Sequence, residues 1–183
     1  MREFIVSNFE HVLFALILVS RLGDIGTTYL ITPKLKLEAN PIARKLGWWF
    51  GALTVLVCIV PYYSTALGVA VLVPSLLISS SNTAKIWFVR AYGESEYYEL
   101  LHRLARTSKF SHAITGTILS ALFIALAGLV LLFFYPDPIH DWGYWVAMGF
   151  LIYAVVIGLY GCLYFARLFK SARRGGDQKT PVP

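Results

Sequence analysis

Charged residues are scarce in this chain of 183 residues, and the short sequences that mark common enzyme classes are missing from it. Only 14% of the residues are Asp, Glu, Lys or Arg, whereas 57% are hydrophobic and the mean hydropathy is +0.65. There is no H-E-x-x-H, no G-x-S-x-G and no G-x-x-x-x-G-K-[ST]. Such sequences are typical of zinc proteases, serine hydrolases and phosphate-binding loops. The composition excludes an ordinary water-soluble domain, and the missing motifs favour a protein without enzymatic activity.

Cysteine and intramembrane aspartate are equally rare. Cys58 and Cys162 are the only cysteines, and each lies within an apolar run. Two isolated cysteines do not form the paired spacing of a disulfide framework or a zinc site, so we predict buried free thiols and no metal site. Asp24 is the only Asp within an apolar run, whereas an intramembrane aspartyl protease needs two such residues.

Long apolar runs dominate what is present. A hydrocarbon core about 30 Å thick needs roughly 20 apolar residues in a helix. The run from 46 to 80 would form a helix about 52 Å long, which is too long for one span and divides naturally near Pro61. We therefore predict an all-α, polytopic membrane bundle of about five transmembrane helices, at about 9–31, 41–62, 64–90, 113–135 and 142–169, followed by a basic, disordered tail at 171–183.

The positions of Lys and Arg predict the orientation of these spans. With five spans, the basic residues of segments 34–45, 85–109 and 167–179 share one side, and only Arg2 lies on the other. Four spans give a weaker bias. Because basic residues favour the cytoplasmic side, we predict a multi-pass protein of the inner or plasma membrane, with its N-terminus outside and its C-terminus in the cytoplasm. This pattern, without a separate basic domain, gives no reason to expect nucleic acid as a partner.

A polar segment at 93–112 separates the third and fourth predicted spans. Within it, apolar residues recur at i, i+3, i+4 and i+7, which is the spacing of one helical face. These residues are Tyr97, Leu100, Leu101 and Leu104. The segment predicts a short amphipathic helix on the cytoplasmic membrane surface, where it would rest on the lipid or bind a soluble partner.

Ionisable residues inside an apolar run are the main candidates for function, because charge in a membrane is costly unless a partner compensates it. Arg21 and Asp24 lie three residues apart in the first predicted span and therefore share a helical face. Threonines extend this stripe, and the next loop brings further polar residues back to the membrane edge. The predicted intramembrane polar site comprises Arg21, Asp24, Thr27, Thr28, Glu38 and Asn40.

Two interpretations of this site remain open. In the first, carboxylate, hydroxyl and amide oxygens converge to hold a proton or a hard cation, with Arg21 as counter-charge. Its members are Asp24, Thr28, Glu38 and Asn40. In the second, Arg21 neutralises Asp24, and the remaining polar groups tie the first helix to the second, because buried polar groups in lipid need partners. Gly23 and Thr27 favour the second interpretation, since small residues four apart allow close helix approach.

The same region carries a family resemblance. The stretch G-D-I-G-T-T-Y-L at Gly23–Leu30, followed by L-E-A-N-P at Leu37–Pro41, resembles the D-x-x-T-T and E-x-N-P pattern of a family of small prokaryotic membrane proteins of unknown function. The resemblance covers about residues 21–88. It implies a three-helix module to which the fourth and fifth predicted spans are added, and it implies no reaction.

Three functions follow as hypotheses. The first is an accessory or scaffold subunit that binds the lipid bilayer and packs against a membrane-protein partner or a second copy of itself. The second is a small proton- or cation-coupled transporter or channel that uses the intramembrane polar site. The third is an interfacial lipid- or quinone-modifying enzyme with Glu38 and either His102 or His112 as acid and base. His102 and His112 are also weaker candidates for metal or haem ligands, and the sequence identifies no cofactor.

Small residues in the last two predicted spans indicate where helices approach closely. The pairs are Gly116 with Ser120, Ala121 with Ala125, and Gly158 with Gly161.

Overall fold

The computed structural model describes residues 8–177, and the regular structure of this part of the chain is entirely helical. Four helices are long and apolar enough to cross a membrane. The predicted all-α bundle is therefore confirmed for the described residues, and its long helices are compatible with a membrane-embedded protein. These helices are α2 (Phe9–Ile31), α6 (Thr65–Thr83) together with α7 (Ile86–Tyr92), α9 (Phe110–Phe134) and α10 (Trp142–Asp177).

The second predicted span, at 41–62, is not one continuous helix. It divides into α3 (Pro41–Leu46), α4 (Trp48–Val55), a 3-10 turn η1 (Leu56–Ile59) and α5 (Val60–Tyr63). Gly47 interrupts the helix with a φ of 63°, a conformation that favours glycine. At about 1.5 Å per residue, the apolar part Trp48–Tyr63 is about 24 Å long. It is therefore shorter than the other four apolar helices.

Capping residues explain where these helices begin. The Asn40 side-chain oxygen accepts hydrogen bonds from the backbone N–H of Ile42 at 2.9 Å and of Ala43 at 3.4 Å, and Pro41 occupies the first helical position. Ser64 caps α6 in the same way, with its hydroxyl accepting from Leu67 N at 3.3 Å. The predicted helix start at Pro41 and the predicted division after Pro61 are both confirmed.

Two further boundaries differ from the prediction. The span predicted at 64–90 is interrupted by a turn at Ala84 and Lys85 between α6 and α7, and α7 ends at Tyr92, before Gly93, which has a φ of 76°. Helix α10 continues beyond 169 to Asp177, so the first part of the tail predicted to be disordered is helical. The rest of that tail, 178–183, and Arg2 lie outside the described residues.

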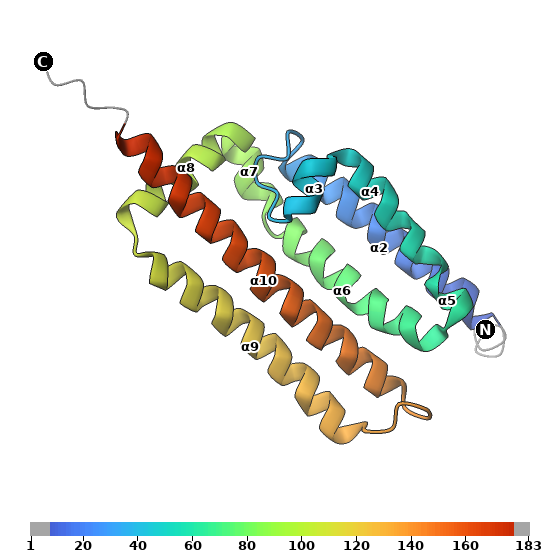
Figure 1. Ribbon diagram of the computed structural model, residues 1–183. Coiled ribbons are helices and arrows are strands. Elements are labelled where there is room, and N and C mark those ends of the chain that lie inside the picture. The colour runs from blue at the N-terminus through green and yellow to red at the C-terminus, as the bar shows by residue number, and fades with distance from the viewer. Residues whose placement is uncertain (1–7, 178–183) are drawn as a thin grey trace, which may run out of the picture.

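The helices lie side by side in the order α9, α10, α6, α2 and then α4 with α5 (Figure 1). Contacts between residues far apart in the sequence occur at both ends of the helices, along the direction of their axes. At one end, His11 Nδ1 lies 2.9 Å from the Tyr62 hydroxyl and Phe9 meets Trp142 edge to face. At the other end, the loop after α2 meets the start of α8 (Glu94–Thr107) and the last turns of α10.

Glycine allows close packing at two contacts of α10. A Cβ atom at Gly149 would lie 2.6 Å from Val73 Cβ and 3.0 Å from the Ala70 carbonyl oxygen, both on α6. Pro74 lacks the N–H that would otherwise bond this carbonyl, so the oxygen is free of its usual helical partner. On the opposite side of α10, a Cβ at Gly161 would lie 2.6 Å from Thr117 Cγ2 on α9. The helices can approach this closely only because both positions lack a side chain.

The small-residue prediction is therefore confirmed in part. Gly158 and Gly161 do face α9, because Thr117 and Ala121 are their nearest neighbours. Gly116 does not take part in close packing, since a Cβ there would meet no atom within 4 Å.

Helix α8 packs on the end of α10. Ala105 is buried against Leu168, Phe169 and Ala172 of α10, with Leu101 beside it. Leu104, which belongs to the predicted apolar face, is 52% exposed. The amphipathic helix is therefore present, and its contact with the membrane surface stays a prediction.

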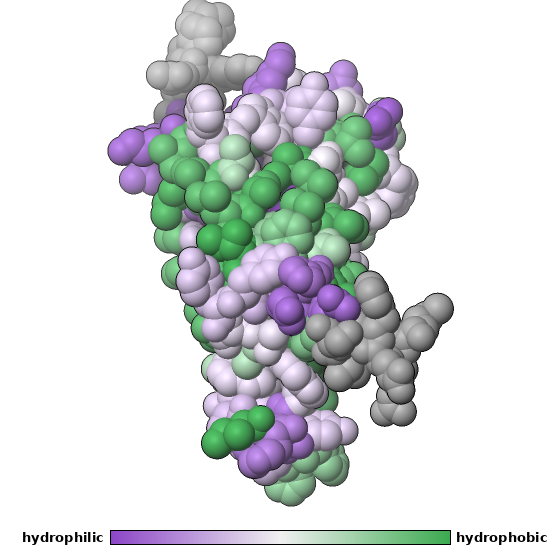
Figure 2. Space-filling model, turned by 90° about the vertical axis from the view of Figure 1, so that its right-hand side faces the viewer, coloured by the Kyte–Doolittle hydropathy of each residue, from purple (hydrophilic) through white to green (hydrophobic). Residues whose placement is uncertain are grey.

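Much of the remaining surface is apolar. Phe123 and Phe133 of α9 are 69% and 80% exposed, and Val19 of α2 is 69% exposed. Figure 2 shows hydrophobic residues over much of one face, with the strongly hydrophilic residues gathered in separate patches. A surface of this kind is stable where its surroundings are also apolar.

Candidate functional site

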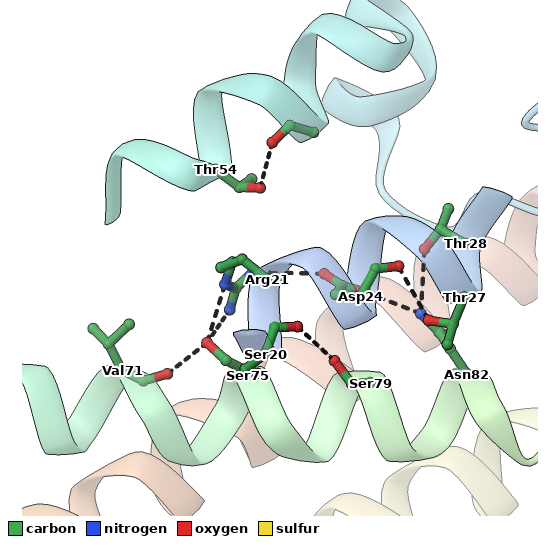
Figure 3. Close-up of polar contacts among 11 residues, drawn as sticks. Ser20, Arg21, Asp24, Thr27, Thr28, Thr54, Val71, Ser75, Ser79 and Asn82 are labelled. Carbon is green, nitrogen blue, oxygen red and sulfur yellow. Dashed lines mark hydrogen bonds and ion pairs between the residues drawn. The ribbon is translucent and has the colours of Figure 1, made fainter. Parts of the chain in front are cut away.

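A row of polar side chains joins α2 to α6 in the middle of the bundle (Figure 3). On α6, the polar residues recur at i, i+4 and i+7, so they project from one face toward α2. We call this row the polar seam. On α2 it comprises the side chains of Arg21, Asp24, Thr27 and Thr28 and the backbone carbonyl of Ser20, and on α6 the side chains of Ser75, Ser79 and Asn82. The buried Ser20 hydroxyl itself has no hydrogen-bond partner among the described residues.

Arg21 makes the first link across the seam. Its Nε lies 3.1 Å from the Ser75 hydroxyl oxygen, and a second guanidinium nitrogen donates to the same oxygen. Ser75 is completely buried, and its hydroxyl donates in turn to the Val71 carbonyl at 2.7 Å. Arg21 also forms an ion pair with Asp24, with Nη1 and Oδ2 3.6 Å apart. The guanidinium thus holds a hydroxyl of α6 and a carboxylate of its own helix.

Asp24 is compensated at both carboxylate oxygens. Oδ2 faces Arg21, and Oδ1 accepts a hydrogen bond from Asn82 Nδ2 at 3.0 Å. The same amide nitrogen lies 3.3 Å from the Thr28 hydroxyl, whereas Thr27 donates to the Asp24 carbonyl of its own helix. The Arg21 and Asp24 side chains are only 12% and 19% exposed. A cation in the place of either partner would have to displace Arg21 or Asn82.

The seam connects α2 with α6, rather than with the helix that follows α2 in the sequence. Ser79 donates to the Ser20 carbonyl at 2.9 Å. Gly23 lies beside this contact, but a Cβ there would be 3.7 Å from the Ser79 hydroxyl, an ordinary van der Waals distance, so the contact does not require glycine. Sequence reasoning missed Ser75 and Ser79. Their spacing with Asn82 is a periodic polar stripe in an apolar run, and this signal could have revealed them.

Glu38 and Asn40 occupy the loop beyond α2 and do not hydrogen-bond to Asp24. The Asn40 side chain caps α3, and Glu38 Oε1 accepts from the Asn40 backbone N–H at 2.7 Å. Burial raises the pKa of Glu38, and the Asp24 charge raises it further, whereas nearby N–H groups and Arg167 oppose the rise. The structure therefore places Asp24 and Thr28 together and puts Glu38 within their electrostatic reach. The Asn40 side chain instead caps α3.

This raised pKa predicts how stability depends on pH. Between the ordinary pKa of about 4.5 and the raised pKa of Glu38, the folded chain holds a proton that the unfolded chain has lost, so stability falls as pH rises through this range. Glu38→Gln keeps the acceptor for Asn40 and has no charge to bury. We expect the variant to be more stable than the parent at pH 7 and to lose this advantage below about pH 4.5, measured by thermal unfolding in detergent.

Glu96→Gln is the matched control, because Glu96 is an exposed residue of α8 and the substitution removes the same charge. An equal gain from Glu96→Gln would contradict the explanation by burial.

Glu94, the first residue of α8, organises the loop after α2. Its carboxylate accepts hydrogen bonds from the Thr32 hydroxyl, from Lys34 N at 3.1 Å and from Lys36 N at 2.9 Å. On the other side of the loop, Arg167 of α10 donates to the Ala39 carbonyl. The loop is thereby fixed to two helices that follow much later in the sequence, and no sequence motif indicated Glu94.

The weaker histidine candidates lie apart from the seam. The His102 ring packs against Tyr98 with centroids 4.4 Å apart and the ring planes tilted by 54°, and its buried Nε2 has no hydrogen-bond partner among the described residues. His112 lies exposed at the start of α9, and no hydrogen bond or ring contact joins it to His102 in this part of the structure. Across 8–177, no cluster of three His, Cys, Asp or Glu side chains is placed to hold a metal. Cys58 is buried, Cys162 is half-buried, and both are free thiols.

Comparison with models of protein families, with curated proteins and with solved structures found no match to this chain.

Proposed function

We propose that this protein is a multi-pass cell-membrane protein that acts by packing against another membrane protein, as an accessory or scaffold subunit. The observation that carries the proposal is the pairing of the polar seam within the chain. Both oxygens of Asp24 have partners on α2 and α6, and so does the guanidinium of Arg21. A seam of this kind holds two helices together in lipid, where polar groups without partners are costly.

Helix α9 offers the surface for such packing. It lies at the edge of the row and packs mainly on α10, so most of its length faces outward (Figure 1). The exposed side chains along it are large and apolar, and Leu122, Phe123 and Leu126 are 58%, 69% and 55% exposed. A helix attached along one side only has the rest of its surface available to another helix.

The proposed topology has five passes, with the short apolar segment Trp48–Tyr63 as the second. This segment runs back along α2, because contacts of α2 extend from α4 through η1 to α5. Its length of about 24 Å is close to the thickness of a thinned bilayer. The described Lys and Arg residues other than Arg21 lie in three segments, 34–45, 85–109 and 167–174. All three segments are at the end of the bundle where Glu94 lies (Figure 1). This end would face the cytoplasm.

We also propose that α2, the segment Trp48–Tyr63 and α6 form one module and that α9 and α10 are added to it. The basis is packing: the first three contact one another, whereas α9 packs mainly on α10 and α10 connects this pair to α6. This arrangement is the one that the family resemblance of residues 21–88 implies.

Photo-crosslinking in native membranes tests the proposed partner surface. A photoreactive phenylalanine analogue at Phe123, 69% exposed on α9, is expected to give a discrete larger adduct. The control places the same group at Val19, which is also 69% exposed but lies on α2, and no discrete adduct is expected there. Adducts of equal yield at both positions, or crosslinks to lipid alone at Phe123, would contradict the assignment of α9.

A further inference from the structure

A basic cleft lies where the cytoplasmic ends of the helices would meet the membrane surface. The loop after α2, α3, α8 and the last turns of α10 surround a cavity of about 390 Å³. An adjoining cavity of about 410 Å³ shares three of its residues, so the two form one cleft. The basic residues that line it are Lys34, Lys36, Arg44, Arg167, Lys170 and Arg174.

The positive charge of this cleft is only partly neutralised within the described part of the chain. No Asp or Glu lines either cavity. The only ion pairs of the described residues are Arg21 with Asp24 and His140 with Asp137, neither of which lies in the cleft. The carboxylate of Glu94, the first residue of α8, is occupied by three hydrogen bonds from residues 32–36. Glu38 of the loop interacts electrostatically with Arg167, so it offsets part of the charge. Six cations gathered in a hollow with so little counter-charge attract an anion.

The chemistry of the lining fits phosphate. Guanidinium groups match two phosphate oxygens at once, and lysine adds point charge. Tyr98 and Tyr164 also line this cavity, and tyrosine is enriched at the headgroup level of membranes. Arg167 is held in place by the carbonyl oxygens of Ala39 and Leu163, so one cation of the cleft is already fixed.

We infer that this cleft binds the phosphate of an anionic phospholipid headgroup. A lipid is the source of phosphate that the position favours, because the cleft opens at the end of apolar helices and beside the amphipathic helix α8. Basic pockets between transmembrane helices on the cytoplasmic side recognise such headgroups. The inference uses the membrane placement proposed above, and it does not depend on the accessory role.

Neighbouring residues of equal charge provide a strict control. Arg44 and Arg174 line the cleft, whereas Lys45 and Arg173, the residues beside them, do not. All four are exposed and none makes a hydrogen bond or ion pair with another described side chain. A double change of either pair lowers the net charge by the same amount. A loss of binding that is confined to the first pair would therefore show that the cleft itself binds the lipid, and that general positive charge does not.

The experiment is a lipid titration of the full-length detergent-solubilised protein, followed by native mass spectrometry. Phosphatidylglycerol is expected to bind more tightly than phosphatidylcholine. Arg44→Gln with Arg174→Gln is expected to weaken phosphatidylglycerol binding about tenfold, the effect of losing charged hydrogen bonds. Lys45→Gln with Arg173→Gln is expected to change it less than about twofold.

Equal losses in the two double variants, or equal binding of the two lipids, would overturn the inference. Binding of inorganic pyrophosphate without binding of phosphatidylglycerol would also overturn it, by identifying a soluble anion as the ligand. If Arg44→Gln with Arg174→Gln does not fold, Lys170→Gln replaces it, with Lys45→Gln as its control. Lys170 lines the cleft, is exposed and has no hydrogen-bond partner among the described residues.

Discussion

Replacing Asp24 with alanine is expected to lower the free energy of unfolding by about 3 kcal/mol, because it leaves the charge of Arg21 buried without compensation. The side chains of this pair are 12% and 19% exposed, so water screens the remaining charge poorly. Asn82 loses its acceptor on Oδ1 in the same variant. The measurement is the reversible unfolding of the purified protein in mixed micelles, with helix content as the signal.

The double variant Arg21→Met with Asp24→Ala is the control for this prediction. It removes both charges, and we expect it to recover most of the loss, because a buried pair is costly mainly when one partner is absent. Asp24→Asn is expected to lie between the two, since it keeps an oxygen for Asn82 and loses the ion pair. A change of less than about 0.5 kcal/mol for Asp24→Ala would be the effect of an ordinary surface position, and would show that the seam does not hold α2 and α6 together.

Asp24→Asn also separates the accessory role from a proton or cation path. In the transport hypothesis, Asp24 exchanges protons or binds the ion, so the amide would abolish flux in proteoliposomes without loss of folded protein. In the accessory hypothesis, the variant changes stability, and any flux is the same as that of the parent.

Gly149→Ala is expected to destabilise the protein by about 2 kcal/mol, because one added methyl group overpacks the contact between α10 and α6. The new Cβ would lie 2.6 Å from Val73 Cβ and 3.0 Å from the Ala70 carbonyl oxygen. A second change, Val73→Ala, is expected to recover only part of this loss. It removes the contact with Val73 Cγ1 at 3.1 Å, but alanine keeps the Cβ atom at 2.6 Å, and the Ala70 carbonyl belongs to the backbone and cannot be trimmed.

Gly116→Ala is the control for this prediction, measured by the same unfolding experiment. Gly116 lies inside α9, in its second turn, and an added Cβ meets no atom within 4 Å. We expect this variant to be as stable as the parent or more stable by about 0.5 to 1 kcal/mol, the usual gain when alanine replaces glycine inside a helix. Equal effects at the two glycines would contradict the close approach of α10 to α6.

The sequence predicted what depends on local patterns. Apolar runs located the helices, and Asn40 with Pro41 located a helix start, because a cap acts within a few residues. It did not predict the interruption at Gly47, since a glycine inside an apolar run is equally compatible with a continuous helix until its φ is known. The length of α10 was also missed, because its last turns are stabilised by packing on α8 rather than by their own composition.

For the polar site, the sequence identified one side of each contact better than the other. Arg21, Asp24 and Thr28 were predicted from their spacing on one helix. Their partners Ser75 and Asn82 lie more than fifty residues away, and ordinary serine and asparagine spacing does not reveal which helix they face. The prediction that the second helix in sequence order would receive these contacts was wrong, because α6 is the neighbour of α2 on that side.

The hydrogen bonds of Glu94 set an order on the assembly of the chain. Its carboxylate is separated from Thr32, Lys34 and Lys36 by 62, 60 and 58 residues. Ribosomes make the earlier residues first, so the loop after α2 has to wait for the translation of α6 and α7 before its backbone N–H groups find their acceptor. Until then these groups bond to water, and in the proposed topology the turn between the first two passes is not yet fixed to the rest of the chain.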